Sequence, residues 1–266
     1  MDDLLYVENK DERGVLEIAL NRPQVHNAFN EDLIAQLTER FQKVNEQEDV
    51  RLVVLCGKGK SFSAGADLNW MKKMKEYTDK ENYKDSVNLS RMFQVMNACE
   101  KPLIGKIQGA ALGGGCGIVS VCDYVVAERD CRFGFTEVRL GLIPAVISPF
   151  VMAKIGESAA RAFFLSGIRF NSDRAYHMGL VHHVCDKEKL DEETDQIVKS
   201  FLKAAPQAAS SAKTLVSEVL HSSSEFEESL IDYTCRSISK IRISDEGQEG
   251  MDALLSKRLP NWIKEE

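Results

Sequence analysis

The apolar and polar positions in the first part of the chain predict strands that alternate with helices. Residues 14–20 are expected to form a strand that ends before Pro23, because a proline has no N–H to donate to a sheet. Residues 52–56 form a continuous apolar run, which is typical of a strand buried on both faces. Between them, Asn30 is placed to cap a helix whose apolar residues fall on one face, namely Leu33, Ile34, Leu37, Phe41 and Val44. The order of strand, helix and strand predicts an α/β protein.

The same alternation continues through the middle of the chain. Residues 80–99 have a mostly helical pattern, and residues 103–107 form another buried strand. A glycine-dense turn and an apolar helix follow, and two short strands are predicted at residues 124–127 and 132–135. Repeated units of strand, strand and helix favour a spiral α/β core over an open nucleotide-binding sheet.

The last part of the chain is almost purely helical in pattern. The predicted helices cover residues 188–203, 208–221, 225–241 and 247–258. A helical C-terminal region attached to an α/β core often packs against another subunit. We therefore expect a core over residues 1–190 and a helical C-terminal region for oligomerisation over residues 191–266.

Composition and charge narrow the classes of partner. The chain has 266 residues and a formal net charge of −7, with its basic residues scattered, so no nucleic-acid partner is expected. No segment has the apolar length needed to span a bilayer, so no membrane partner is expected either. The seven cysteines form no C-x-x-C pair and mostly lie in apolar runs, which is typical of reduced packing residues.

Two further features bear on location and on metal binding. Residues 1–12 are acidic and lack the pattern of a secretory signal or a mitochondrial presequence, so we expect a cytoplasmic protein, or one of an organellar matrix if the chain is a trimmed mature form. His182 and His183 are adjacent, and neighbouring side chains on a strand point to opposite faces. Because no Cys, Asp or Glu partner stands at ligand spacing, no metal site is expected.

A run of three glycines, Gly113 to Gly115, lies between a predicted strand and an apolar helix. Free N–H groups at a helix start suit an oxygen that carries or gains negative charge, so the turn fits either a phosphate or an oxyanion. A dinucleotide site would place G-x-G-x-x-G directly after the first strand, and no such motif occurs there. A tight packing corner is the plain structural alternative.

A second loop makes the oxyanion interpretation stronger. Residues 63–68 also leave a buried strand and precede a short helix, so they present N–H groups at a helix start. Two such loops, each leaving a parallel strand, can direct one N–H each at a single carbonyl oxygen.

The chain resembles the enoyl-CoA hydratase/isomerase (crotonase) family over almost its whole length. The matching motifs occur in the family's order at residues 20–29, 60–68, 101–117, 122–144 and 249–258. The resemblance implies a crotonase-like β-β-α spiral core with a helical C-terminal trimerisation region that also covers the CoA site. It further implies a homotrimer or homohexamer that acts on an acyl-CoA thioester, with coenzyme A as part of the substrate and no permanently bound cofactor.

The resemblance also implies roles for individual residues. The oxyanion donors fall on the N–H groups of Ala66 and Gly114, and Glu137 falls on the position of a catalytic glutamate. Apolar neighbours of Glu137, which are Phe133, Phe135, Leu140 and Ile143, are expected to raise the pKa of its carboxyl toward the range useful for proton transfer.

One position departs from the family's pattern. Hydratases of the family usually carry a second glutamate just after the glycine run, and this chain has Gly117 there. Residues 66–71, 113–117 and 144–150 resemble the methylglutaconyl-CoA hydratase branch, which acts in leucine breakdown.

The resemblance implies CoA-binding residues in three segments, which are Gln24, Val25 and His26 at the pantetheine entry, Ala64, Asp67 and Leu68 on the adenine loop, and Lys257 of a neighbouring subunit at a phosphate. Each has a plainer alternative. For Asp67 the alternative is a helix cap, whereas His26 is favoured to cap the turn after Pro23 and Lys257 is favoured to lie in solvent.

The main hypothesis for function is an enoyl-CoA hydratase that adds water to 3-methylglutaconyl-CoA. An enoyl-CoA isomerase is the first alternative, because moving a proton needs only one carboxylate and Gly117 fits that requirement. A non-catalytic acyl-CoA-binding protein is the second alternative, and the presence of Glu137 argues against it.

Overall fold

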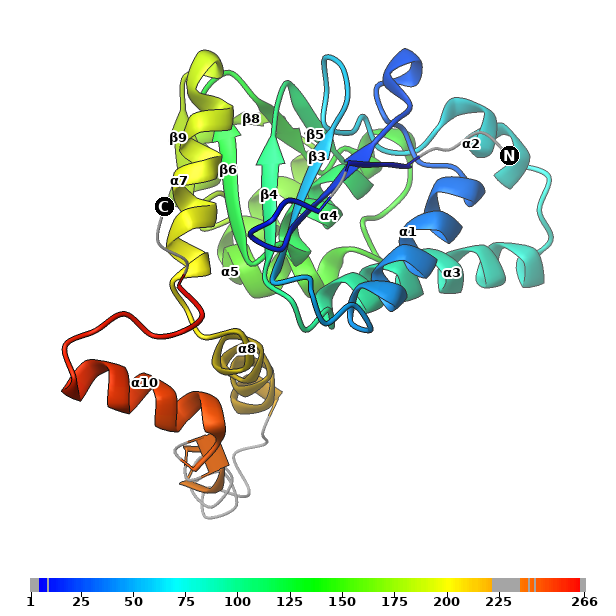
Figure 1. Ribbon diagram of the computed structural model, residues 1–266. Coiled ribbons are helices and arrows are strands. Elements are labelled where there is room, and N and C mark those ends of the chain that lie inside the picture. The colour runs from blue at the N-terminus through cyan, green and yellow to red at the C-terminus, as the bar shows by residue number, and fades with distance from the viewer. Residues whose placement is uncertain (1–4, 9, 222–234, 239, 242, 264–266) are drawn as a thin grey trace.

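The computed structural model describes residues 5–8, 10–221, 235–238, 240–241 and 243–263, and its largest element is a six-stranded sheet (Figure 1). The strands lie in the order β1 (Leu5–Glu8), β2 (Val15–Leu20), β3 (Leu52–Gly57), β4 (Leu103–Ile107), β6 (Tyr124–Glu128) and β9 (His183–Cys185). β1 is antiparallel to β2, and all the other neighbours are parallel.

A second sheet has three strands, β5 (Ala110–Leu112), β7 (Arg132–Gly134) and β8 (Phe170–Asn171). β5 directly follows β4 along the chain, and β7 directly follows β6, so a strand of the first sheet leads into one of the second. Helix α4 (Gly114–Val121) then follows β5. This is the succession of strand, strand and helix that the sequence predicts.

Helices cover both faces of the six-stranded sheet (Figure 1). On one face, α1 (Glu31–Val44) lies against α3 (Asp79–Asn97), and α4 lies against α5 (Ser148–Ser166); on the other face, α7 (Leu190–Leu202) packs on β4 and β6. Strand β3 shows how the faces divide. Val53 and Leu55 belong to the large core under α1, whereas Leu52 and Val54 belong to a smaller core under α7, as the two-residue period of a strand requires.

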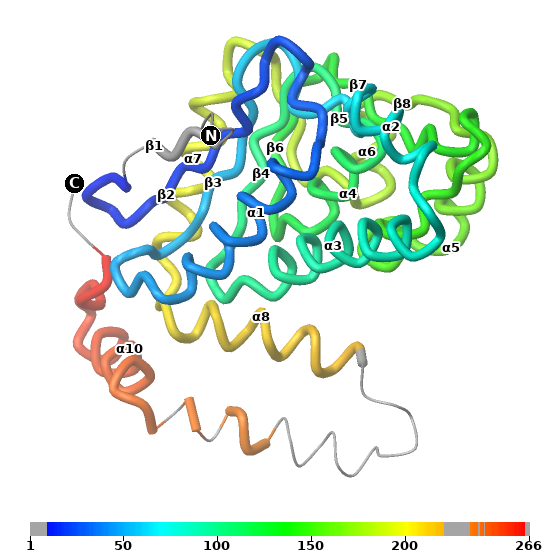
Figure 2. Tube along the Cα trace, turned by 90° about the vertical axis from the view of Figure 1, so that its right-hand side faces the viewer, coloured from blue at the N-terminus to red at the C-terminus, as the bar shows by residue number. Residues whose placement is uncertain are grey.

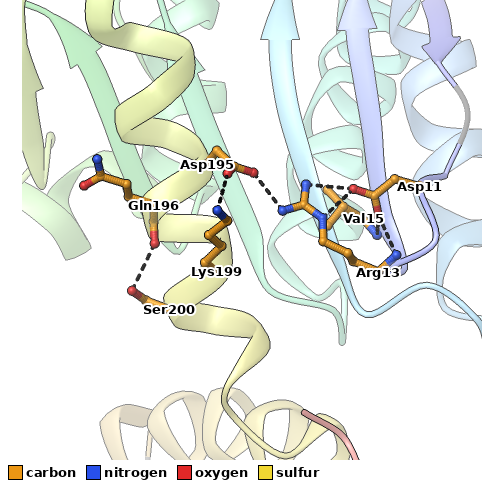
Figure 3. Close-up of polar contacts among 7 residues, drawn as sticks. All are labelled: Asp11, Arg13, Val15, Asp195, Gln196, Lys199 and Ser200. Carbon is orange, nitrogen blue, oxygen red and sulfur yellow. Dashed lines mark hydrogen bonds and ion pairs between the residues drawn. The ribbon is translucent and has the colours of Figure 1, made fainter. Parts of the chain in front are cut away.

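Helix α7 is also joined to the β1–β2 corner by a charged side chain (Figure 3). The Arg13 guanidinium donates to Asp11 Oδ2 at 2.8 Å and to Asp195 Oδ1 of α7 at 2.8 Å. Asp11 Oδ1 in turn accepts from the Val15 N–H at 3.0 Å. Because these side chains are partly exposed, the apolar core beneath α7 contributes more to its attachment than the ion pair does.

The C-terminal helices α8 (Pro206–His221) and α10 (Asp245–Leu255) lie beyond one end of the core in both views (Figure 1, Figure 2). Arg51 fixes the start of this region, because its guanidinium donates to the carbonyls of Leu202 and Ala204 and to that of Trp262. The predicted helix at residues 225–241 falls largely outside the described residues.

Shorter elements complete the described chain. They are α2 (Leu68–Met74), α6 (Ser172–His177) and the 3₁₀ turns η1 (Pro23–Val25), η2 (Glu137–Leu140) and η3 (Lys187–Lys189). None of the helices in the described ranges is both long enough and apolar enough to cross a membrane.

Candidate active site

The first predicted loop runs from β3 to α2 and contains the Ala66 N–H, one of the predicted donors. Asp67 caps α2, since its Oδ1 accepts from the Asn69 N–H at 2.8 Å. The amides of Ala64 and Asp67 donate to carbonyls of the segment before α1, at 2.9 and 2.8 Å. Among the described residues, no acceptor is recorded for the Ala66 N–H. This donor is therefore available to a ligand.

The second predicted loop is the glycine turn between β5 and α4. Gly113 has φ 49° and precedes the helix, and its N–H donates to the Gly134 carbonyl at 2.9 Å. Gly114 is the first residue of α4, so its N–H has no acceptor within the helix. A positive φ such as that of Gly113 is a backbone conformation that residues with a Cβ rarely adopt.

A pair of backbone hydrogen bonds holds the two loops side by side. Ser63 and Ala111 form a parallel bridge, in which the Ser63 N–H donates to the Ala110 carbonyl at 2.9 Å and the Leu112 N–H donates to the Ser63 carbonyl at 3.0 Å. Ala66 follows Ser63 by three positions, and Gly114 follows Ala111 by three positions. The register of this bridge therefore brings both predicted donors to the same end of adjacent extended segments.

Glu137 lies against the glycine turn. It begins η2 directly after β7, and a Cβ built on Gly113 would lie 3.1 Å from Glu137 Oε1. The Oε2 atom is buried and has no hydrogen-bond partner within the described chain. Burial raises the pKa of the Glu137 carboxyl above its ordinary value of 4.5, and this effect outweighs the opposing effect of a backbone hydrogen bond. The raised pKa suits a group that exchanges protons near neutral pH.

The predicted surroundings of Glu137 are only partly correct. Phe133 and Phe135 are fully buried, as expected, but the side chains of Leu140 and Ile143 are mostly exposed. Both follow Glu137 in η2 and the turn after it, where these side chains lie at the surface.

The space beside Gly117 is filled by apolar side chains. A Cβ built on Gly117 would lie 2.5 Å from Ile147 Cγ2 and 2.8 Å from Phe93 Cε1. Both of these side chains are buried. The chain therefore lacks a second carboxylate at this position and also leaves no room for one.

Some of the residues implied for CoA binding are exposed, whereas Asp67 is already bonded to other parts of the protein. Gln24, Val25, Ala64 and Leu68 are exposed near the two loops. The Asp67 carboxylate is buried and already occupied, since Oδ1 caps α2 and Oδ2 pairs with the Arg22 guanidinium at 2.8 Å. The Asp67 backbone is bonded as well, because its N–H donates to the Phe29 carbonyl at 2.8 Å and its carbonyl accepts from the Met71 N–H at 2.9 Å.

The two remaining CoA candidates have different settings. The His26 N–H closes the turn onto the Pro23 carbonyl at 3.2 Å, and His26 Nδ1 lies 3.0 Å from Ser61 Oγ, so the capping role favoured from the sequence is present. Lys257 follows α10, which lies away from the site loops of the same chain (Figure 1). A CoA contact by Lys257 therefore requires a second copy of the chain.

Within the described ranges, no group of three His, Cys, Asp or Glu side chains is placed to hold a metal ion. Six of the cysteines are buried, and Cys235 is exposed. Burial raises the pKa of several of these thiols, for example that of Cys122 to about 12. Such thiols stay protonated and act as packing residues.

Comparison with known proteins agrees with the geometry. The family model described as enoyl-CoA hydratase/isomerase matches residues 10–265. The chain belongs to this enoyl-CoA hydratase/isomerase family. A Legionella pneumophila structure assigned to the enoyl-CoA hydratase/isomerase (crotonase) group is 40% identical, with a TM-score of 0.90 over 99% of this chain and 100% of that one.

Two other members extend the comparison. The structure of an enoyl-CoA hydratase from Shewanella pealeana is 35% identical, with a TM-score of 0.92 over 98% of this chain and 96% of that one. A crotonyl-CoA hydratase from Syntrophomonas wolfei is 29% identical over 97% of each chain. The crotonase fold expected from the sequence is thereby confirmed.

Membership of the enoyl-CoA hydratase/isomerase family leaves two residues whose positions the motifs do not explain. Arg22 and Phe29 both lie in the first matching motif, but nothing in their sequence spacing shows that they contact Asp67 and Gly114. The available signal is weak: Arg22 follows the end of a buried strand by two residues, and Phe29 follows it by nine.

The raised pKa of Glu137 predicts a pH-dependent effect on stability. A carboxyl whose pKa is raised by folding binds more protons in the folded state, so wild-type stability falls as pH rises from about 4.5 through the raised pKa. We expect Glu137→Gln to melt at a higher temperature than wild type near pH 7.5, with the difference shrinking toward pH 4. Thermal unfolding across this range measures the effect, with the exposed Glu76→Gln as control. Equal melting temperatures at pH 7.5 would contradict a buried, unpaired carboxylate.

The crowding at Gly117 predicts the sign of a second substitution. Helix propensity alone favours alanine over glycine by about 1 kcal/mol. The clash with Ile147 and Phe93 opposes this gain, and we expect Gly117→Ala to lower the free energy of unfolding by about 1–3 kcal/mol. Urea unfolding measures the loss of unfolding free energy in Gly117→Ala, in Ile147→Ala and in the double variant. The loss in the double variant should be smaller than the sum of the losses in the two single variants. A stabilised single variant would show that the pocket is open.

Proposed function

We propose that the protein is an enoyl-CoA hydratase, which adds water to an α,β-unsaturated acyl-CoA. The observation that carries this proposal is the buried carboxyl of Glu137 beside the two N–H donors of Ala66 and Gly114. Such donors stabilise the negative charge that develops on a thioester oxygen when the conjugated double bond is attacked. This arrangement fits reactions of thioesters that pass through an enolate, such as the addition of water to a conjugated double bond.

The proposed reaction uses one carboxyl twice. The Glu137 carboxylate takes a proton from water while the water oxygen bonds to C3 of the enoyl group, and the electron pair of the double bond moves onto the thioester oxygen as an enolate. Ala66 and Gly114 donate hydrogen bonds to that oxygen. The Glu137 carboxyl then returns its proton to C2, and the product is a 3-hydroxyacyl-CoA. Both new bonds form on the face of the substrate that Glu137 occupies.

For the substrate we propose 3-methylglutaconyl-CoA, an intermediate of leucine degradation. The support is the resemblance of residues 66–71, 113–117 and 144–150 to the methylglutaconyl-CoA hydratase branch. Crotonyl-CoA is the reference substrate, because a relative that matches 97% of this chain is named crotonyl-CoA hydratase.

The specific observation that favours a second function is the filled space at Gly117. Phe93 and Ile147 fill the place of a second carboxylate at Gly117, so no carboxylate at that position can share a water molecule with Glu137. A single carboxylate suffices to move a proton between C4 and C2 of a 3-enoyl-CoA, so an enoyl-CoA isomerase is the alternative. A protein that only binds acyl-CoA has no use for a buried, unpaired carboxyl, which costs stability.

The test offers the purified protein 3-methylglutaconyl-CoA, crotonyl-CoA and a 3-enoyl-CoA. We expect a 3-hydroxy product from the first two substrates, and a loss of at least about 100-fold in kcat for Glu137→Gln, because general acid–base groups contribute about 10²–10⁴-fold. Product analysis by mass spectrometry distinguishes added water from a moved double bond. Double-bond migration with no 3-hydroxy product would replace the hydratase assignment with the isomerase.

We also propose that residues 191–266 assemble the chain into a homotrimer or a dimer of trimers. The support is the number of large apolar side chains exposed on α8 and near α10, which include Val216, Leu220, Leu254, Leu255 and Leu259. Assembly would also bring Lys257 of one copy toward the CoA site of another.

Light scattering coupled to size exclusion tests the assembly. We expect the mass of three or six chains for wild type and a smaller species for Leu254→Asp, because a charge on this face opposes burial. The exposed Glu76→Gln should keep the wild-type mass. A monomeric wild-type protein at micromolar concentration would contradict the proposal.

A further inference from the structure

Phe29 is bonded to both sides of the first donor. Its N–H donates to the Gly65 carbonyl at 2.7 Å, and its carbonyl accepts from the Asp67 N–H at 2.8 Å. These two bonds form a parallel bridge between Phe29 and Ala66. The backbone of Phe29 therefore sets the plane of the peptide that carries the Ala66 N–H.

The ring of Phe29 packs against the second donor. A Cβ built on Gly114 would lie 2.7 Å from Phe29 Cε2 and 2.9 Å from Phe29 Cδ2. The ring is almost fully buried, with 1% of the residue exposed. Gly114 thus lies so close to the ring edge that a residue with a Cβ would not fit there. Phe29 therefore contacts both of the loops that carry the donors.

Phe29 is itself held by a buried ion pair. The Arg22 guanidinium donates to the Ala28 carbonyl and pairs with Asp67 Oδ2 at 2.8 Å. The side chains of Arg22 and Asp67 are only 12% and 7% exposed. Arg22 is therefore bonded to the residue just before Phe29 and to the residue just after Ala66, which fixes the segment that carries the ring.

A neighbouring amide fixes the preceding turn. Asn27 is fully buried, and its Nδ2 donates to the carbonyls of Lys58 at 2.9 Å and Ser61 at 2.8 Å. Its Oδ1 accepts from the Arg22 N–H at 2.7 Å. The segment before α1 is thus bonded to the loop after β3 by side chains as well as by backbone.

We propose that Phe29 is a positioning residue that sets the separation and direction of the two oxyanion donors. This inference rests on the proposed oxyanion role of Ala66 and Gly114. An aromatic ring is a rigid spacer, and the Phe29 backbone bridge and ring contact act on the two donors from opposite ends of the same residue. Because a displacement of about 1 Å from productive geometry costs about 100-fold in rate, a spacer between two donors is catalytically important.

The first test compares Phe29→Leu with Phe41→Leu, a matched control in which a buried phenylalanine of α1 in the same core is shortened. With crotonyl-CoA, we expect kcat to fall about 10–100-fold in Phe29→Leu while KM changes less than about threefold, because the donors act mainly on the developing charge. Phe41→Leu should keep kcat within about threefold of wild type. Equal losses of kcat in both variants would overturn the proposal and leave only a packing role.

A spectroscopic readout measures the donors without turnover. Hydrogen bonds to the thioester oxygen shift the absorption of a bound dimethylaminocinnamoyl-CoA to longer wavelength, because they polarise its conjugated system. We expect a smaller red shift in Phe29→Leu than in wild type and an unchanged shift in Phe41→Leu. An unchanged shift in Phe29→Leu would overturn the proposal. If the wild-type protein shifts the absorption of this probe but hydrates no substrate, the hydratase function is wrong. The size of the shift in Phe29→Leu would still decide whether Phe29 positions the donors.

A double-mutant cycle with Gly114→Ala tests the contact between the ring and the second donor by a separate route. Gly114→Ala forces a Cβ against the ring and should reduce the red shift by itself. Adding Phe29→Leu removes the Cε and Cζ atoms and should restore part of the shift, so the two effects are not additive. Additive losses would show that the ring does not contact the second donor in solution and would overturn the proposal.

Discussion

The parallel bridge between Ser63 and Ala111 is the interaction on which the rest of the site depends. It fixes the register between the loop after β3 and the strand β5, and each donor follows its bridge residue by three positions. A slip of one residue in either segment would turn one N–H away from the other, since the side-chain and backbone directions of extended chain alternate. The spiral of strand, strand and helix repeats the geometry of one turn in the next. Two loops far apart in sequence therefore place their N–H groups at the same end of adjacent segments, and in the proposed function both donate to one oxygen.

The carboxyl of Glu137 is useful because the fold leaves it buried and unpaired. Burial opposes its ionisation and raises its pKa, and no other charged side chain contributes to that shift. This setting costs folding free energy, which the large core under α1, α3 and α4 offsets. The same core fills the space beside Gly117 with Phe93 and Ile147, so this packing also excludes a second carboxyl from that position. The burial of Phe93 and Ile147 therefore both contributes to the core and limits this part of the chain to one acid–base group.

Strands and helices whose apolar residues recur at a regular spacing could be predicted from the sequence. β2, β3, β4 and α1 each carry a pattern that identifies them, and the loops that hold Ala66, Gly114 and Glu137 follow from where the predicted strands end. β9 and α5 are not among the elements predicted from the sequence, although the buried residues of α5 recur at helical spacing. Leu140 and Ile143 are expected from the sequence among the apolar neighbours of Glu137, but both are mostly exposed because the turn after Glu137 lies at the surface. The pairing of Asp67 with Arg22 and the contact of Phe29 with Gly114 join distant segments, which periodicity does not report.

The central claim is that one thioester oxygen is bound by two backbone donors next to one buried carboxyl. The most direct measurement is a crystal structure of Glu137→Gln with bound crotonyl-CoA. We expect the thioester oxygen to lie about 2.7–3.1 Å from both the Ala66 and the Gly114 nitrogen atoms, with C2 of the acyl group facing residue 137. A thioester oxygen that contacts neither nitrogen, or an acyl chain on the far side of the glycine turn from residue 137, would contradict it.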